Sequence, residues 1–352
     1  MKSLSRRDFL KLGGLSLGSL AFTPRLRNLF DFDDSSLVRV ATDSVSVYSK
    51  PSDESSIVST WFRDELVHVY EEVVADTPKH NPIWYRVWGG YMHRARLQRV
   101  KTLFNTVPSV IPEGGQRLAE VTVPISYPYR KSKASSSGWE KINPPIYFGS
   151  VHWVVGIETG PDGESWYRIF DELDSNVPYY LPTLHMRALA AEEMSPISVD
   201  VPWDQKRIEV NLTTQVLTAF EYDKPAFQTK ISSGIPGGDF KTPSGEFYIQ
   251  EKMPSKHMGN SYFDVGKKGL VNSFADADGY VLPGIPWTCF FTPAGHAFHG
   301  TYWHENFGTP MSHGCINMRT EEAKWLFRWA LPPHEVGRTF NRGRGTLVRV
   351  YY

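Results

Sequence analysis

Residues 295–319 read GHAFHGTYWHENFGTPMSHGCINMR and contain one cysteine, Cys315, inside the run SHGC at 312–315. A histidine, His299, stands 16 positions upstream (315 − 299) and is followed by Gly300. A cysteine nucleophile needs a base for its proton and hydrogen-bond donors for the oxyanion that its attack creates. His299 can be the base, and the glycine before the cysteine lets the backbone turn and present amide groups beside the sulfur. The pattern therefore predicts a thiol-dependent acyl-transfer site.

This stretch resembles the signature of the L,D-transpeptidase catalytic-domain family, whose members act on the peptide stems of bacterial peptidoglycan. The family pattern is a His-Gly pair, a spacer of somewhat over a dozen residues, Ser-His-Gly-Cys, an aliphatic residue, and Asn or Arg. All of it is present here in order. The resemblance reaches back to about Pro196 and includes KTPSGEF at 241–247, which is similar to the family's TPxGxF turn. It implies a β-sandwich-like catalytic domain over residues 197–352.

The resemblance also implies roles for single residues. Cys315 is expected to attack the carbonyl of the third stem residue, with D-Ala at position four leaving and His299 moving the proton. The Gly300 carbonyl is expected to orient the imidazole, and the amides of Gly314 and Cys315, with His313, to stabilise the oxyanion. A structural hydrogen-bonding role for His313 stays open. Substrate contacts are expected from Asn317, Trp303, Tyr302 and Ser312. No cofactor and no metal are expected.

The acyl group is expected to pass to the amine of a neighbouring stem, which gives a 3→3 crosslink and remodels the cell wall. Water or a wall-attached protein as acceptor stays open. A papain-like cell-wall peptidase is an alternative, but its histidine follows its cysteine, and here only His334 follows Cys315. A non-catalytic envelope-binding protein is the other alternative, although it would not need an intact site.

Two further interpretations concern the cysteines. Cys289 lies in WTCFF at 287–291, an aromatic setting typical of a buried strand, and is expected to be an inert core residue. A zinc site is disfavoured because His313 and Cys315 are closer in sequence than the usual structural ligand spacings and no CxxC pair is present. Two cysteines also form no disulfide framework.

Composition limits the fold and the partners. The chain has 352 residues, which suggests two or three domains, and its 25 prolines and 14% aromatic residues favour a mainly β protein over a helical one. Its 38 basic and 38 acidic residues balance, so nothing calls for nucleic acid as a partner.

The N-terminal residues indicate export. SRRDFLK at 5–11 matches the twin-arginine consensus, and an apolar, glycine-containing run follows to Phe22, too short to span a bilayer comfortably. We interpret residues 1–22 as a twin-arginine signal peptide and 23–36 as a polar linker. The twin-arginine export machinery and the cell wall are therefore expected partners, and the cell envelope is the expected location.

Two similar segments follow. Alternating apolar and polar residues over 37–102 predict short strands, and the pattern resembles a bacterial SH3-like domain, a small β-barrel. The tetrapeptide Trp84-Tyr85-Arg86-Val87 is echoed by Trp166-Tyr167-Arg168-Ile169, 82 positions later (166 − 84), which predicts a second SH3-like barrel over 115–194. A single irregular β domain is the alternative. Such barrels imply a wall-binding or positioning role, and both tryptophans are expected to be core residues.

The C-terminal segment is expected to contain alternating strands, a flap and one helix. The flap is expected over Met253–Trp287, because that stretch has few periodic apolar runs. The helix is expected over Thr320–Ala330, with Thr320 as its cap. His257 and His304 are expected at the surface. The strands are expected at 207–212, 215–220, 228–233 and 247–250, with 347–351 closing the sheet.

Overall fold

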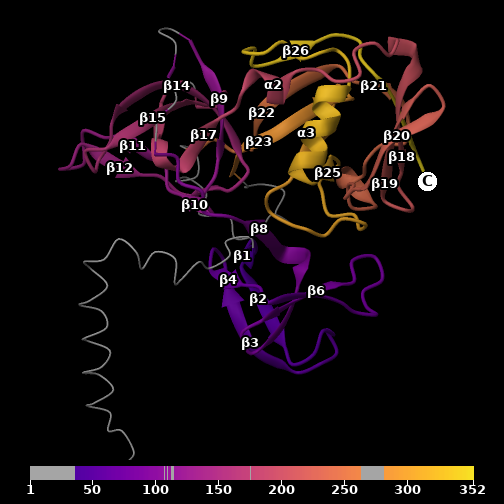
Figure 1. The fold of residues 1–352 in the computed structure, drawn as a ribbon, viewed down its shortest axis with the longest axis horizontal. Coiled ribbons are helices and arrows are strands. Elements are labelled where there is room, and N and C mark those ends of the chain that lie inside the picture. The colour runs from indigo at the N-terminus through magenta and orange to yellow at the C-terminus, as the bar shows by residue number, and fades with distance from the viewer. Residues whose placement is uncertain (1–35, 107, 109, 112–114, 175, 263–280) are drawn as a thin grey trace, which may run out of the picture.

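The structure, a computed structural model, describes residues 36–352 apart from 107, 109, 112–114, 175 and 263–280. The signal and linker predicted over 1–36 lie outside this range except for residue 36. The described chain is mainly β, as predicted, with six sheets and few helices. Figure 1 shows an N-terminal part in indigo, a middle part in magenta, and a C-terminal part that runs from orange to yellow.

The N-terminal part, residues 36–100, consists of two sheets with strand orders β4-β1-β8 and β3-β2-β7-β6-β5. Its elements are β1 (Leu37–Val40), β2 (Ser44–Tyr48), β3 (Ile57–Phe62), β4 (Leu66–His68), β5 (Glu71–Val74), β6 (Ile83–Val87), β7 (Gly90–His93), the 3₁₀ turn η3 (Arg94–Arg96) and β8 (Leu97–Val100). No ladder joins the two sheets within the described residues, so the predicted barrel is not closed. Trp84 is buried against Tyr48 and His93, as expected of a core residue.

The middle part, residues 117–194, is built on one seven-stranded antiparallel sheet of order β12-β11-β16-β15-β14-β9-β17, with a separate β10–β13 pair. Its elements are β9 (Arg117–Val121), β10 (Ile125–Ser126), β11 (Tyr129–Lys131), β12 (Trp139–Lys141), β13 (Ile146–Tyr147), β14 (Val151–Thr159), β15 (Ser165–Phe170), β16 (Tyr179–Pro182), η4 (Thr183–His185), β17 (Met186–Ala188) and α2 (Ala191–Met194). Here too the strand order is open rather than a closed barrel. Trp166 is buried, and its Nε1 donates to Asp162 Oδ1 at 2.7 Å.

The C-terminal part, residues 203–351, contains two five-stranded sheets of order β20-β19-β18-β27-β21 and β25-β24-β23-β22-β26. Its elements are η5 (Trp203–Gln205), β18 (Lys206–Asn211), β19 (Val216–Glu221), β20 (Lys224–Lys230), η6 (Gly238–Phe240), β21 (Gly245–Tyr248), β22 (Glu251–Gly259), β23 (Val281–Phe290), β24 (Ala297–Gly300), β25 (Ile316–Met318), α3 (Thr320–Trp329), β26 (Asn341–Arg342) and β27 (Leu347–Tyr351). One apolar core joins both sheets and α3, which packs on β23 and β24 (Figure 1).

Most expected elements of this part are present, with three corrections. The expected helix is α3, but its N-cap is Arg319 and makes no side-chain cap bond, so Thr320 is not the cap. The stretch expected to be a flap instead contains much of two long paired strands, β22 and β23, at its two ends. Their side chains are buried largely without strict alternation, which hides the strand period; residues 263–280 lie outside the described range. Strand β27 does not close an edge but lies between β18 and β21.

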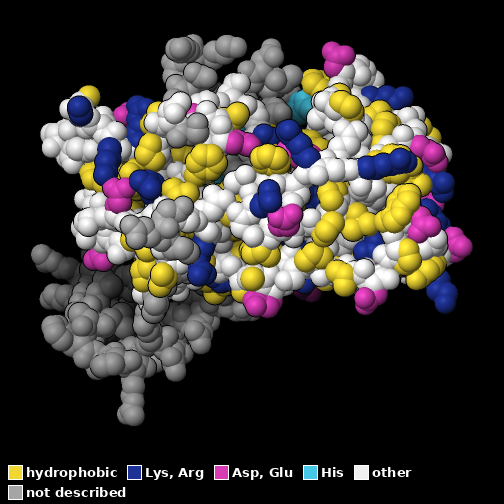
Figure 2. Space-filling model, turned by 90° about the horizontal axis from the view of Figure 1, so that it is seen from above, with side chains coloured by type: hydrophobic (Ala, Val, Ile, Leu, Met, Phe, Trp, Pro, Cys, Tyr) yellow, Lys and Arg dark blue, Asp and Glu magenta, His cyan; other side chains and the backbone are white. Residues whose placement is uncertain are grey.

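Within the described ranges, no helix is both long and apolar enough to cross a membrane. The face in view in Figure 2 carries Lys and Arg side chains interspersed with Asp and Glu, with apolar side chains between them. Charge of one sign therefore does not gather over that face.

Candidate active site

Two neighbouring strands bring the predicted nucleophile and base together. β24 carries His299 and runs parallel to β25, with Phe298 opposite Ile316 and His299 opposite Asn317. Cys315 is the residue directly before β25. Because adjacent strands are about 4.8 Å apart, this pairing sets Cys315 beside the strand that bears His299. Both side chains line one cavity of about 260 Å³.

A network of hydrogen bonds fixes the turn before Cys315. Ser312 Oγ donates to the carbonyl of Cys315 and accepts from the Gly314 amide at 3.2 Å. Gly314 has φ +112, and a Cβ there would lie 2.8 Å from His296 Cδ2, so both backbone and space require glycine. Thr242 Oγ1 donates to Gly314 O at 2.8 Å. Thr242, in the TPSGEF turn, was not among the predicted site residues, although the motif pointed to it.

The imidazole of His299 is buried and oriented by the backbone. Its Nδ1 donates to Gly300 O at 3.0 Å, which is the contact expected of Gly300 and leaves Nε2 free to accept a proton. Burial lowers the pKa of His299 to about 4, against a smaller opposing effect of the Gly300 carbonyl. His299 is therefore a neutral base near pH 7. Gly300 has no room for a side chain, since a Cβ would lie 2.8 Å from Pro286 Cγ.

The thiol of Cys315 is also neutral at rest. Cys315 is half-buried, and its Sγ lies 3.7 Å from Gly295 O. Burial raises the pKa of the Cys315 thiol to about 11, despite a hydrogen bond with the backbone of Ala297 that acts to lower it. The resting site therefore holds a neutral thiol beside a neutral imidazole.

The cavity gathers six of the nine predicted site residues. These are Cys315, His299, His313, Ser312, Trp303 and Asn317. Tyr302 is not among its lining residues: the side chain is buried, and its hydroxyl donates to Pro283 O at 2.9 Å. The structure thus places Tyr302 behind the cavity wall rather than on it.

Asn317 and His304 form a buried pair at the cavity. The Asn317 amide nitrogen lies 2.9 Å from His304 Nε2, and His304 Nδ1 accepts from the Asn306 amide at 3.2 Å. His304 was expected at the surface, and this was wrong, because its partner stands 13 positions away in sequence and is brought close only by β25. One polar atom of the Asn317 side-chain amide is buried without a partner among the described residues, so this amide can form a further hydrogen bond with a ligand.

His334 does not line the cavity that contains Cys315. It is buried, and its ring lies 5.1 Å from that of Phe327 on α3. A papain-like arrangement of Cys315 with a downstream histidine is therefore not present. Cys289 is fully buried, as expected, and burial raises the pKa of its thiol to about 12.

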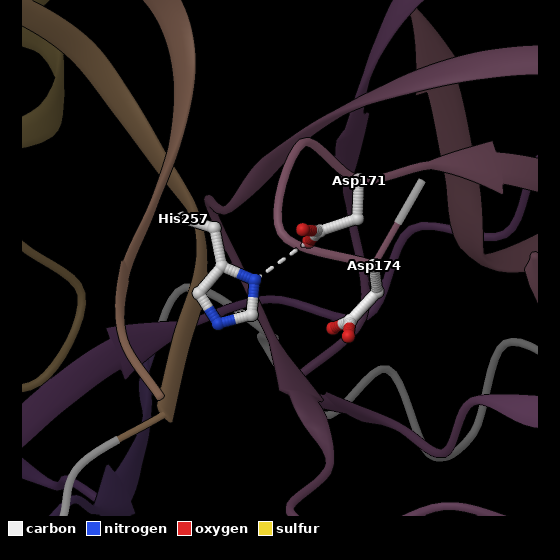
Figure 3. A group of neighbouring side chains, drawn as sticks. All are labelled: Asp171, Asp174 and His257. Atoms are coloured by element: carbon white, nitrogen blue, oxygen red, sulfur yellow. Dashed lines mark hydrogen bonds and ion pairs between the residues drawn. The ribbon is translucent and has the colours of Figure 1, made fainter. Parts of the chain in front are cut away.

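A second cluster of titratable groups joins the middle and C-terminal parts. Asp171, Asp174 and His257 are all buried. One side-chain atom of each that could bind a metal lies within 4.8 Å of the corresponding atoms of the other two (Figure 3). His257 Nδ1 lies 2.7 Å from Asp171 Oδ2, and its Nε2 lies 2.9 Å from Asn260 O. The expectation that His257 is at the surface was therefore wrong.

The side-chain atoms of this cluster that could bind a metal already form hydrogen bonds with other protein groups. Asp174 accepts from the Ser261 hydroxyl and from the Tyr262 amide, at 3.1 Å. Burial acts to raise the pKa of Asp171, but its hydrogen bond and charge interaction with His257 outweigh burial and leave the pKa below its ordinary value. The hydrogen bond between His257 and Asp171 satisfies this geometry without a metal, and the cluster has no residue on the Cys315 cavity.

Comparison with known proteins identifies the C-terminal part. Residues 205–350 match the family model of the L,D-transpeptidase catalytic domain. The comparison with curated proteins gave no match.

Solved structures with similar folds include three L,D-transpeptidases. One from Xylanimonas cellulosilytica is 22% identical and covers 42% of this chain and 60% of its own, with a TM-score of 0.28. One from Mycobacterium smegmatis is 19% identical and covers 52% and 76%, with a TM-score of 0.31. The catalytic domain from E. faecium is 24% identical and covers 41% and 95%, with a TM-score of 0.29. The family match, and not these distant likenesses, identifies the domain.

Proposed function

Residues 205–350 belong to the L,D-transpeptidase catalytic-domain family, and from that premise we propose that the chain is a peptidoglycan L,D-transpeptidase with Cys315 as its nucleophile. The observation that supports this most is the single cavity shared by the Cys315 thiol and a neutral, backbone-oriented His299. Because its Nδ1 carries the proton, this neutral imidazole has an unprotonated Nε2 that can accept the proton of the thiol.

The reaction begins with the arrival of a tetrapeptide stem. As Cys315 Sγ bonds to the carbonyl carbon of the third stem residue, His299 Nε2 takes the thiol proton. The oxyanion that forms would be stabilised by amide groups of the turn at 312–315, whose backbone is fixed by Ser312 and Thr242. The bond to D-Ala then breaks, and His299 returns the proton to its leaving amine, which leaves a thioester on Cys315.

The second half of the reaction needs an amine acceptor. The amine of a neighbouring stem attacks the thioester, His299 takes the proton of that amine, and the thiol is regenerated as a 3→3 crosslink forms. The side-chain amide of Asn317, which lines the cavity and has one unpartnered polar atom among the described residues, is suited to a hydrogen bond with either stem. Trp303 offers an aromatic wall to the same cavity.

Delivery and placement of this activity are further parts of the proposal. The twin-arginine pattern at 5–11 supports export to the cell envelope through the twin-arginine machinery. Segments 37–102 and 115–194 would act as SH3-like units that position the catalytic domain at the wall.

Products made from purified disaccharide-tetrapeptides test the proposal. Mass spectrometry should show 3→3 crosslinked dimers with the wild-type protein and none with Cys315→Ala. Cys289→Ser is the matched control and should retain product formation, because Cys289 does not line the cavity. Tripeptides without dimers would make the protein a hydrolase instead, and unchanged tetrapeptides with a folded wild-type protein would contradict the proposal.

A further inference from the structure

The wall of the Cys315 cavity is not supplied by the C-terminal part alone. Ala41, Thr42 and Arg96, all from the N-terminal part, line it together with Cys315 and His299. Within the described chain, a segment that begins more than 200 residues upstream of the nucleophile therefore shapes the space in which a ligand would bind.

Backbone hydrogen bonds hold Arg96 at this place. It is the last residue of η3, and its carbonyl accepts from the Ala41 amide at 3.0 Å. The preceding carbonyl, that of Ala95, accepts from the Glu305 amide at 3.0 Å. Asn81 Nδ2 donates to Glu305 O at 3.1 Å on the same side. The turn is thus attached to the chain segment that begins directly after His299 and Gly300.

A buried arginine strengthens the contact between the N-terminal and C-terminal parts. Arg39 is fully buried, and its Nη2 donates to Tyr302 O at 3.2 Å. The same guanidinium pairs with Asp64 Oδ1 at 2.8 Å and with Gln98 Oε1 at 2.8 Å. Gln98 Nε2 in turn donates to Phe148 O of the middle part at 2.7 Å. Two of these bonds, from Arg39 to Tyr302 O and from Gln98 to Phe148 O, cross to other parts of the chain, and their buried donors would lose these acceptors if the N-terminal part moved away. The wall that contains Arg96 is therefore held in place.

Arg96 differs from the neighbouring arginines because its guanidinium has no partner within the described residues. Arg94 Nε donates to Asn81 Oδ1 at 2.7 Å, and Arg99 pairs with Glu72 at 2.6 Å. The side chain of Arg96 is exposed and has no hydrogen-bond or ion-pair partner within the described residues. It also borders a neighbouring cavity that contains Asp53, without forming an ion pair with it.

The rest of the cavity offers no compensating charge. No Asp or Glu is among its described lining residues, and Arg96 is the one Lys or Arg there. Burial lowers the pKa of His299 to about 4 and that of His304 to about 3, so both are neutral near pH 7. Arg96 therefore lines a cavity without carboxylates, and its guanidinium, with five donors in a planar fork, matches a ligand carboxylate.

We propose that Arg96 binds a carboxylate of the peptide that acylates Cys315, so that the N-terminal part completes the substrate site. This rests on the proposed function, since the ligand is the stem peptide. The carboxylate is either the C-terminal one of the leaving residue or a side-chain one further along the stem. Arg96 is a binding residue in this account and takes no part in proton transfer.

The test compares donors and variants in one series. The wild-type protein, Arg96→Gln, Arg96→Lys and the control Arg86→Gln are each given a tetrapeptide donor, its C-terminal amide, and an analogue with its side-chain carboxylates amidated. Arg86 is a matched control because it is an exposed arginine of the same part that pairs with Glu71 at 3.0 Å and does not line the cavity.

Arg96→Gln is expected to raise KM for the free-acid donor about tenfold to hundredfold, the range of a hydrogen bond to a charged group, with kcat nearly unchanged. Arg96→Lys should lie between Arg96→Gln and the wild type, because it keeps the charge but loses the fork. Amidation of the carboxylate that Arg96 binds should raise the wild-type KM by a similar factor and should have no further effect in Arg96→Gln. The amide that shows this lack of additivity identifies which carboxylate is bound.

The outcomes separate this inference from the proposed function. Turnover of the free-acid donor by the wild type, with KM the same in Arg96→Gln, overturns the role of Arg96 and leaves the transpeptidase activity standing. Absence of wild-type turnover overturns both. A fall in kcat with KM unchanged, or an equal effect on both amides and the free acid, also overturns it, because neither is a loss of carboxylate binding.

Discussion

His299 and His257 are both buried histidines of the C-terminal part, yet their hydrogen-bond partners are of different kinds. His299 Nδ1 donates to a backbone carbonyl, that of Gly300, and its other nitrogen faces the cavity. His257 Nδ1 faces the Asp171 carboxylate, and its other nitrogen is used by Asn260 O. His299 keeps one ring nitrogen without a partner among the described residues, whereas His257 uses both ring nitrogens in contacts with protein groups. The first arrangement suits a base, and the second suits a tether between two parts of the chain.

The two cysteines give a similar comparison. Burial raises the pKa of both thiols, to about 11 for Cys315 and about 12 for Cys289. A lowered thiol pKa therefore does not distinguish the proposed nucleophile, Cys315, from Cys289. Access distinguishes it, because Cys315 lines the cavity and Cys289 is fully buried.

The largest expected effect is the loss of the base. His299→Gln should lower turnover of a tetrapeptide donor by a factor of about 10² to 10⁴, the usual contribution of a general base. His257→Gln should retain turnover, because that ring does not line the cavity. Steady-state assays of both variants under conditions where each is folded check this. Equal losses in the two variants would remove the distinction between base and tether.

The next effect concerns the protonation state of the resting thiol. Alkylation of Cys315 by iodoacetamide should speed up about tenfold per pH unit between pH 7 and 10, because the thiolate fraction grows at that rate below a pKa of about 11. Mass spectrometry of the labelled peptide should locate the adduct on Cys315 and not on Cys289. A rate that is already constant below pH 7 would instead show a preformed thiolate–imidazolium pair.

A smaller effect links His299 to stability. The pKa of His299 is lowered from 6.5 to about 4 on folding, so near pH 5 the unfolded chain binds a proton that the folded chain does not. The contribution is fully present above pH 6.5 and is lost as the pH falls toward 4, by up to about 3 kcal/mol. Urea unfolding of wild type and His299→Gln at several pH values between 4 and 6.5 gives the free energy of unfolding. This free energy should depend less steeply on pH in the variant than in the wild type. Parallel slopes would contradict the lowered pKa.

The smallest expected effect is the loss of the hydrogen bond between His257 and Asp171, which joins the middle and C-terminal parts. His257→Gln should lower the free energy of unfolding by about 1.5–3 kcal/mol, the value of a hydrogen bond to a charged group. Asp171→Asn should do the same, and the double variant should cost less than the sum, because the two side chains share one interaction. Chemical denaturation of the four proteins provides the cycle. Strict additivity would show that the pair does not hold the two parts together.

The sequence predicted the site better than its surroundings, for a physical reason. Cys315, His299 and the glycines before and after them lie within one short stretch, so their spacing alone indicated the chemistry. The acidic partner of His257 lies far away in sequence: Asp171 stands 86 positions upstream and meets it only when the middle and C-terminal parts pack. A surface position was therefore the natural expectation for an isolated histidine in a polar stretch, and it was wrong.

The residues that form the wall of the cavity are also far apart in sequence, so the sequence did not predict that they meet. Arg96 lies in a segment whose pattern predicted only a small β domain, and nothing in the sequence placed it near Cys315. Strands β22 and β23 were missed because their buried residues do not alternate with exposed ones. α3 was predicted well, since its amphipathic period and its acidic first turn are local signals.

The position of β27 has a consequence for the order in which the protein can mature. This strand inserts between β18 and β21, parallel to the first and antiparallel to the second. A ribosome must therefore pass residue 351 before the sheet that begins at residue 206 can become continuous. The N-terminal part, whose strands all pair within residues 37–100, can fold long before that point. During synthesis, the N-terminal part is thus expected to fold before β27 has been translated. The candidate active site around Cys315 is completed only after the last strand of the C-terminal part has been made.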